Sequence, residues 1–265
     1  MKVILITGLD GSGKSTLLKR IESNKLLDDY QILRLPKIDI EILKPNPQLF
    51  ATASFINQLN DEADIKRVPQ LKAVALFASM LLYRKLIDLA TQAQKSIVYC
   101  ERHPLIDTGI YAQFYAGKLA PGSISLEILS PFDQIYRKEL EYLLNLLPDD
   151  VSVNQSGAIT SFINFIYQWF YIEKKTNIEN LKKIFNVKLP DKIYYLQATP
   201  ELLFERIKNR KILEAHESVE VFTLLDKSYK HLFNEIEASN ANLIKIIDAA
   251  NQTDLDYLYK KLTDL

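Results

Sequence analysis

A glycine-rich segment near the N-terminus contains residue types and a spacing suited to binding phosphate. Residues 8–15 read Gly-Leu-Asp-Gly-Ser-Gly-Lys-Ser, which is Gly, four residues, Gly-Lys and then Ser. Glycine permits backbone angles that other residues rarely adopt, so successive N–H groups can turn into one concavity and hold phosphate oxygens. We therefore predict a phosphate-binding loop whose nucleotide contacts come from Gly8, Gly11, Ser12, Gly13, Lys14, Ser15 and Thr16.

Two side chains of this loop add charge and a metal ligand to the backbone cradle. Lys14 can reach the outer phosphates and neutralise charge on a transferring group, and the Ser15 hydroxyl can ligate Mg²⁺. The helix expected after the loop would direct the positive end of its dipole at the same phosphates. The sequence thus predicts ATP and Mg²⁺ as cofactors.

An acidic and a basic residue follow another short apolar run. In open parallel sheets ligands bind beyond the carboxyl ends of strands, and Glu101-Arg102 would lie at such an end. Glu101 is predicted to help Ser15 hold the metal, and Arg102 to bind a phosphate through its two-pronged guanidinium. A plain surface ion pair is the alternative interpretation of this dipeptide.

A basic cluster near the C-terminal third has two interpretations. It could be a solvated helix end, where positive charge suits the dipole, or a mobile lid that brings cations to the transferring phosphoryl group. Its members are Arg206, Lys208, Arg210 and Lys211.

The elements that must position these residues can be predicted from hydrophobic patterns. Short apolar runs separated by helical patterns predict an α/β P-loop fold, a five-stranded and mainly parallel sheet flanked by helices. The expected strands are Lys2–Thr7, Tyr30–Leu35, Ser96–Cys100, Lys192–Gln197 and Leu243–Ile247. The expected helices include Val68–Gln94, Glu201–Arg210 with Thr199 as its cap, and Leu255–Leu262 with Thr253 as its cap.

The stretch from about residue 117 to 190 lacks strand patterns and is predicted to be a helical insertion in a single domain that spans residues 1–265. Ser130-Pro131 is expected to start a helix that continues to residue 147. Ile159–Glu173 is rich in aromatic residues at helical spacing, which favours an insertion core or a dimer contact over a platform for stacking bases.

Composition excludes several classes of protein. The 265 residues contain 33 Lys plus Arg and 33 Asp plus Glu, so the formal charge is zero and bulk charge does not favour nucleic acid. Cys100 is the single cysteine, which excludes an internal disulfide framework, and His103, His216 and His231 show no metal spacing. No apolar run is long enough to span a membrane, and a strand pattern begins at residue 2, so we expect a cytoplasmic protein.

Several motifs in the same order resemble the thymidylate kinase family, within the wider group of nucleoside and nucleotide kinases. The resemblance covers about residues 1–116 and 190–265. It is carried by Gly8–Thr16 with Asp10 inside the loop, Arg34-Leu35-Pro36, Leu76-Phe77-Ala78, Glu101-Arg102, Glu220-Val221-Phe222 with Tyr229, and Ile247-Asp248-Ala249.

The resemblance implies roles for the matching residues. Asp10 would contact the sugar hydroxyl of a small-molecule nucleotide acceptor, and Phe77 would stack on its base. Arg34 and Arg102 would bind the acceptor phosphate. Arg206 and Arg210 would approach the donor phosphates from a lid and complete a catalytic set with Asp10, Lys14 and Arg102. It also implies a homodimer.

Some positions depart from the family pattern and leave the acceptor open. Leu81 stands where the family has an arginine that reads the pyrimidine, and His103 stands where it has tyrosine. Glu101-Arg102 is more similar to deoxynucleoside kinases, but Leu35 stands where those have a catalytic glutamate. Residues 211–216 lack the family's lid Asp-Arg pair.

The leading expectation is a nucleoside monophosphate kinase that converts dTMP and ATP to dTDP and ADP. A deoxynucleoside kinase and a nucleotide-binding regulatory protein with little catalysis remain as alternatives.

Overall fold

The computed structural model describes residues 1–24, 29–149, 151, 159–210 and 217–264. The chain divides into two compact units, and each is described by itself. The sheet unit comprises Met1–Leu33, Ile87–His103 and Leu189–Leu265; the helical unit comprises Arg34–Leu86 and Pro104–Lys188.

The sheet unit is built on five parallel strands in the order β2-β3-β1-β4-β5. They are β1 (Lys2–Thr7), β2 (Tyr30–Leu33), β3 (Ile97–Cys100), β4 (Lys192–Gln197) and β5 (Ile244–Asp248). Because β1 pairs with β3 on one side and β4 on the other, the glycine-rich loop leaves the middle of the sheet at its carboxyl edge. The predicted α/β class with a five-stranded parallel sheet is confirmed.

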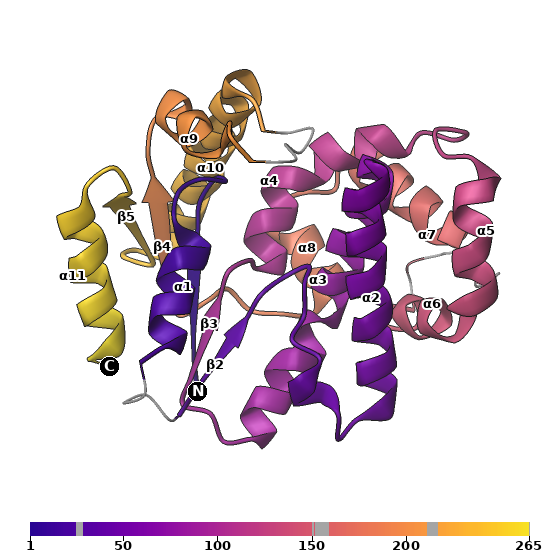
Figure 1. Ribbon diagram of the computed structural model, residues 1–265, viewed down its shortest axis with the longest axis horizontal. Coiled ribbons are helices and arrows are strands. Elements are labelled where there is room, and N and C mark those ends of the chain that lie inside the picture. The colour runs from indigo at the N-terminus through magenta and orange to yellow at the C-terminus, as the bar shows by residue number, and fades with distance from the viewer. Residues whose placement is uncertain (25–28, 150, 152–158, 211–216, 265) are drawn as a thin grey trace. The chain divides into compact units, whose positions relative to one another are not determined.

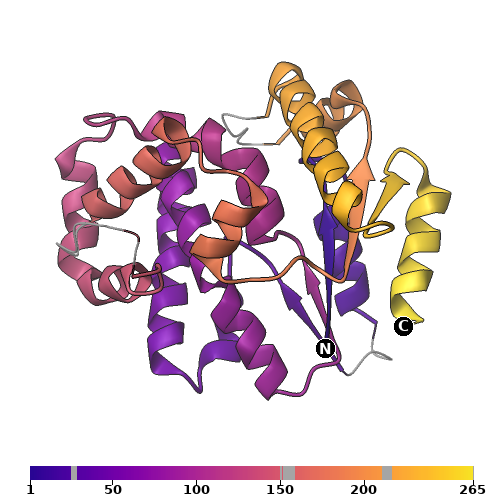
Figure 2. The same ribbon diagram turned by 180° about the vertical axis from the view of Figure 1, so that it is seen from behind.

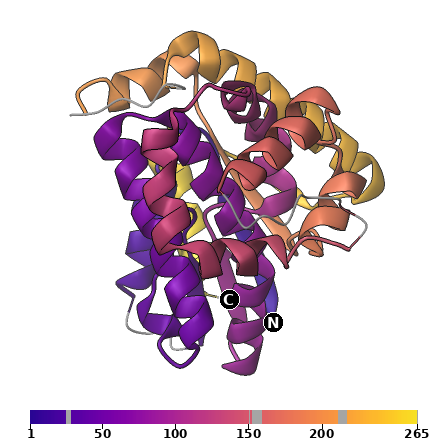
Figure 3. The same ribbon diagram turned by 90° about the vertical axis from the view of Figure 1, so that its right-hand side faces the viewer.

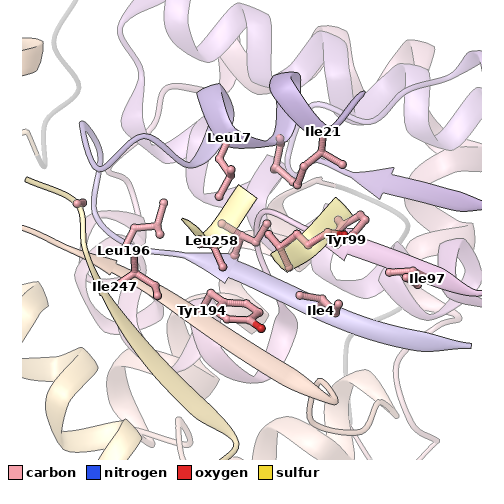
Figure 4. Close-up of a cluster of buried hydrophobic side chains, with 13 residues drawn as sticks. Ile4, Leu17, Ile21, Ile97, Tyr99, Tyr194, Leu196, Ile247 and Leu258 are labelled. Atoms are coloured by element: carbon pink, nitrogen blue, oxygen red, sulfur yellow. Dashed lines mark hydrogen bonds between the residues drawn. The ribbon is translucent and has the colours of Figure 1, made fainter. Parts of the chain in front are cut away.

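Helices cover both faces of this sheet. On one face, α1 (Lys14–Glu22) and α11 (Gln252–Thr263) bury a shared apolar cluster, to which Leu17 and Leu258 contribute from the two helices (Figure 4). On the other face, α10 (Val219–Ser239) lies across β4, where the rings of Tyr229 and Phe233 pack on Tyr195. The two helical layers are seen by comparing Figure 1 with Figure 2.

The helical unit contains most of the remaining helices (Figure 3). They are α2 (Pro47–Lys66), most of α3 (Pro69–Gln92), α4 (Pro104–Ala116), α5 (Leu126–Ile135), α6 (Arg137–Leu144), α7 (Ile159–Ile166), a π-helical turn (Tyr167–Ile172) and α8 (Ile178–Phe185), with short 3₁₀ turns at Glu41–Leu43 and Gly117–Leu119. The described residues between 117 and 188 form helices and their connections, and Tyr136 packs on Phe55 of α2 within this unit.

The end of β2 was predicted wrongly. β2 stops at Leu33 and not at Leu35, because its partner β3 ends at Cys100, opposite Leu33, and offers no further strand for pairing.

Two helix starts were also predicted wrongly. Ser130-Pro131 starts no helix, because Pro131 lies inside α5, which begins at Leu126. Thr253 is not the cap of α11, since Asn251 Oδ1 accepts the Thr253 N–H at 2.9 Å and the helix begins at Gln252.

None of the helices in the described ranges combines the length and the apolar character needed to cross a bilayer.

Candidate functional site

The glycine-rich loop has the backbone that phosphate binding requires. Gly11 and Gly13 have φ angles of 84° and 96°, a region that favours glycine, and Gly13 is the N-cap of α1. No side chain caps this helix. A Cβ on Gly8 would lie 2.5 Å from the Leu196 carbonyl oxygen, so β4 packs directly on the start of the loop. The first turn of α1 thus presents N–H groups to a ligand instead of to a side-chain cap.

Two polar side chains of the loop are buried. Lys14 is only 5% exposed; its Nζ donates to the Leu9 carbonyl oxygen at 3.0 Å and lies 3.6 Å from Asp10 Oδ1. Ser12 is fully buried, and its Oγ has no hydrogen-bond partner among the described residues. A buried hydroxyl without a partner is costly, and Ser12 within the glycine-rich loop is therefore a candidate to contact a ligand.

The structure brings the predicted metal-binding pair together. Ser15 Oγ donates to Glu101 Oε1 at 2.8 Å, which joins the start of α1 to the residue after β3. The Glu101 N–H donates to the Leu33 carbonyl oxygen at 3.0 Å, which fixes the backbone of Glu101 against the end of β2. A hydroxyl and a carboxylate are oxygen ligands of the kind Mg²⁺ prefers. The described residues contain no group of three or more His, Cys, Asp or Glu suited to a metal, so such a cation would take its other ligands from phosphate and water.

The helix α9 (Pro200–Ile207) starts as predicted, because Thr199 Oγ1 accepts the Leu202 N–H at 3.3 Å. Arg206 near its end contacts the loop through backbone oxygens. Its Nη1 donates to the Gly11 carbonyl oxygen at 3.2 Å and its Nη2 to that of Ala249 at 2.9 Å. Arg206 therefore lies beside the loop, and in this structure its guanidinium binds carbonyl oxygens of the protein.

The other cations of the basic cluster have different surroundings. Arg210 Nη1 donates to Glu217 Oε1 at 2.7 Å, and Lys208 forms an exposed ion pair with Glu205 one turn earlier. The predicted lid residues Lys211–His216 lie outside the described residues. The approach of Arg206 and Arg210 to donor phosphates stays a prediction.

Phe77 lies in the core of the helical unit. It is 5% exposed, and its ring centroid lies 5.4–5.7 Å from those of Phe162, Phe165, Phe170 and Phe185. The aromatic segment is thus an insertion core, one of the two roles that its spacing favoured. The structure gives Phe77 a packing role, and its predicted stacking on a base stays a prediction.

Three further predicted contacts concern the acceptor. Arg34 begins the helical unit and Arg102 belongs to the sheet unit, and each is half-buried. Their joint binding of an acceptor phosphate, and the contact of Asp10 with a sugar hydroxyl, remain predictions.

Two groups at this site were missed in the sequence. The Ala249 carbonyl oxygen accepts a hydrogen bond from Arg206 Nη2. Every residue carries such a carbonyl, so the sequence does not single this one out. Glu217 accepts a hydrogen bond from Arg210, but the two residues lie in no common helix or strand, so no periodic pattern in the sequence points to this pair.

Comparison with known proteins gives structural neighbours only. A thymidylate kinase from Candida albicans aligns with 17% identity over 99% of this chain and 89% of its own, with a TM-score of 0.50. A deoxyadenosine kinase from M. mycoides, solved with dCMP and dCDP, aligns with 17% identity over 99% of this chain and 100% of its own, with a TM-score of 0.48. The same enzyme with dATP gives 15% identity over 99% of each chain and a TM-score of 0.47.

No protein-family model matches the chain, and no curated protein matches it in sequence. At such low identity the likeness concerns the fold, a parallel five-stranded sheet flanked by helices that this chain shares with P-loop kinases.

Proposed function

We propose that this protein is an ATP-dependent nucleotide kinase that transfers the γ-phosphoryl group of ATP to a nucleoside monophosphate, with dTMP as the first candidate. The observation that carries this proposal is the 2.8 Å hydrogen bond between Ser15 Oγ and Glu101 Oε1. It joins the hydroxyl of a phosphate-binding loop to a carboxylate at the end of a neighbouring strand. That pairing provides a place for a metal ion bound to nucleotide phosphates.

The residues of the loop fit ATP and Mg²⁺. The positive φ angles of Gly11 and Gly13, the uncapped start of α1 and the buried hydroxyl of Ser12 without a protein partner form a cradle for phosphate oxygens. Ser15 and Glu101 would hold the cation, Glu101 directly or through water. The cation would supply positive charge that neutralises the negative charge of the phosphates.

The Lys14 ammonium group would exchange its contacts within the protein for contacts with the phosphates. This group donates to the Leu9 carbonyl oxygen and lies near Asp10. Phosphate oxygens carry more charge than a carbonyl, so a bound nucleotide competes well for the same ammonium group. In the transition state, Lys14 would neutralise charge that spreads over the transferring group.

A deoxynucleoside kinase is the second candidate, because the residue after β3 is a glutamate in contact with the loop hydroxyl. A nucleoside acceptor needs a base for its hydroxyl proton, whereas a monophosphate acceptor is already an anion. Leu35 stands where such a base would be expected, and this departure favours the monophosphate.

The fold supports a kinase without choosing its acceptor. The thymidylate kinase from Candida albicans has a similar fold, and the sequence motifs resemble that family. Fold alone does not determine function, so the proposal depends on the contacts of the loop.

Measuring ADP release from ATP and Mg²⁺ against a panel of nucleosides and nucleoside monophosphates tests this proposal. We expect release stimulated by a monophosphate, and dTMP is the first to try. Ser15→Ala, purified in the same way, controls for contaminating kinases. Stimulation by nucleosides alone would favour the second candidate. No stimulation by any acceptor would overturn both and favour a nucleotide-binding regulator.

A further inference from the structure

A buried carboxylate lies immediately before α10. The Glu217 side chain is 2% exposed and accepts from Arg210 Nη1 at 2.7 Å, whereas the Arg210 side chain is 51% exposed. Ser218 caps α10 by accepting the Val221 N–H at 3.3 Å, so Glu217 lies beside the positive end of a 21-residue helix. The helix and Arg210 both favour a negative charge at this place.

The backbone before Arg210 is fixed on the phosphate-binding loop. A Cβ on Gly11 would lie 2.7 Å from the Leu203 carbonyl oxygen and 3.2 Å from Ile207 Cγ2, so α9 packs on the loop without space between them. Arg206 adds a hydrogen bond to the Gly11 carbonyl oxygen. The Arg210 N–H donates to the Ile207 carbonyl oxygen at 2.8 Å. The described hydrogen bond of the Arg210 side chain is the one to Glu217.

Arg210 does not need to leave Glu217 in order to bind phosphate. A guanidinium group has five N–H donors, and the half-exposed group of Arg210 keeps donors beyond the one that Glu217 receives. If Arg210 moved away, a buried carboxylate would lose its arginine, which is strongly unfavourable in a protein interior. The two side chains are therefore expected to act as one unit.

We propose that Glu217 is a positioning residue that holds Arg210 in the direction needed to contact the donor phosphates during phosphoryl transfer. This inference rests on the proposed kinase activity. Glu217 itself would touch neither nucleotide nor metal and would act only through Arg210.

A double-mutant cycle tests the inference in the intact protein. Arg210→Gln is expected to lower kcat about 100-fold, because the charge on the transferring phosphoryl group loses a hydrogen-bond donor. Glu217→Gln keeps the shape but removes the charge, and we expect kcat to fall about tenfold with the KM of the acceptor unchanged. The double variant should have the kcat of Arg210→Gln alone, because Glu217 has no effect once Arg210 is gone.

Asp226→Asn is the matched control, since it also neutralises a carboxylate on the α10 segment. Asp226 accepts from Tyr195 Oη at 2.8 Å and from Gln197 Nε2 at 3.2 Å. We expect a lower thermal unfolding midpoint and a kcat within about twofold of wild type. If Glu217→Gln fails to fold, Glu217→Asp keeps the charge with a shorter reach and should lower kcat only when Arg210 is present.

The outcomes separate this inference from the proposed function. An active wild type whose two single effects multiply in the double variant overturns the inference, because Glu217 would then act on the whole structure. Unchanged kcat in Glu217→Gln overturns it as well. A wild type that is inactive with every acceptor overturns the proposed function on which the inference rests.

Discussion

The phosphate-binding loop and the aromatic core of the helical unit both contain buried side chains, but they bury opposite kinds of group. At the loop, Ser12 is fully buried without a partner among the described residues, and the Lys14 ammonium group is enclosed with a single carbonyl hydrogen bond and a nearby carboxylate. Around Phe77 the neighbours are four other phenylalanine rings. A buried polar group alone does not indicate a ligand, since Trp169 Nε1 beside Phe165 is also buried without a partner among the described residues. At the loop, the buried Ser12 and Lys14 coincide with the glycine backbone of a phosphate cradle, and that coincidence favours a ligand, whereas the rings around Phe77 pack on one another.

Replacing Lys14 gives the largest expected effect and acts on function alone. Lys14→Ala should lower kcat by about 1,000-fold or more, because the transferring charge loses its cation. The fold should survive, since the Leu9 carbonyl oxygen still accepts the Ser12 N–H at 3.2 Å. ADP release and the thermal unfolding midpoint measure the two effects. Retained phosphoryl transfer in this variant would contradict the proposed mechanism.

Replacing Phe77 should act mainly on stability. Phe77→Ala removes a ring from a closed aromatic cluster, so the free energy of unfolding should fall by about 3–5 kcal/mol. Tyr171→Ala is the control, because residue Tyr171 is 46% exposed and its replacement should lower the free energy of unfolding by only about 1 kcal/mol. Urea unfolding and the KM of the acceptor are the measurements. Unchanged stability with a raised KM would show instead that Phe77 stacks on the base.

The sequence predicted the sheet well because each strand carries its own pattern. β1 and β4 have the predicted bounds, since apolar runs and flanking polar residues mark both ends. β2 was predicted two residues too long, because its end depends on where its partner stops. The helix α2 was not predicted, because polar Thr52 and Asn60 lie in its buried stripe and apolar Ile65 is exposed, so the apolar residues of the sequence show no clear stripe.

The site was predictable where its backbone conformation follows from residue identity. The loop conformation could be inferred from its glycines. The Ser15–Glu101 contact could be inferred because both residues follow strands expected to be parallel, whose carboxyl ends meet at one edge of the sheet. The partners of the two arginines could not be inferred. Arg206 binds main-chain oxygens and Arg210 binds a carboxylate beyond the end of α9, and these contacts form only when separate segments of the chain fold together.

The glycines offer a test of close packing at the loop with backbone strain held constant. Gly11 and Gly122 have similar φ angles of 84° and 79°, but a Cβ would meet the Leu203 carbonyl oxygen at Gly11 and nothing within 4 Å at Gly122. Gly11→Ala should therefore lower the free energy of unfolding by about 2–4 kcal/mol and Gly122→Ala by about 1–2 kcal/mol. Urea unfolding of both variants measures the difference. Equal losses would mean that α9 can move away from the loop.

Tyr99 provides a buried polar group whose hydrogen bond is made within the protein. Its hydroxyl donates to the Leu262 carbonyl oxygen at 2.6 Å, and burial, with the neighbouring Tyr194 and Tyr30, raises its pKa from 10 to about 12. The native state then holds this proton more tightly than the unfolded chain does. The stability from Tyr99 is complete below pH 10 and is lost as pH rises through about 12.

Tyr99→Phe should accordingly cost only about 1 kcal/mol at pH 7, the value of one satisfied hydrogen bond. The wild type and the variant should converge in unfolding free energy as pH rises above 10, which urea unfolding between pH 7 and 11 would measure. A constant difference across that range would show that the native environment does not disfavour the ionised hydroxyl. Tyr99 and Ser12 are equally buried, but only the Tyr99 hydroxyl has a hydrogen-bond partner in the protein. Nucleotide binding should therefore leave the difference in unfolding free energy between wild type and Tyr99→Phe unchanged.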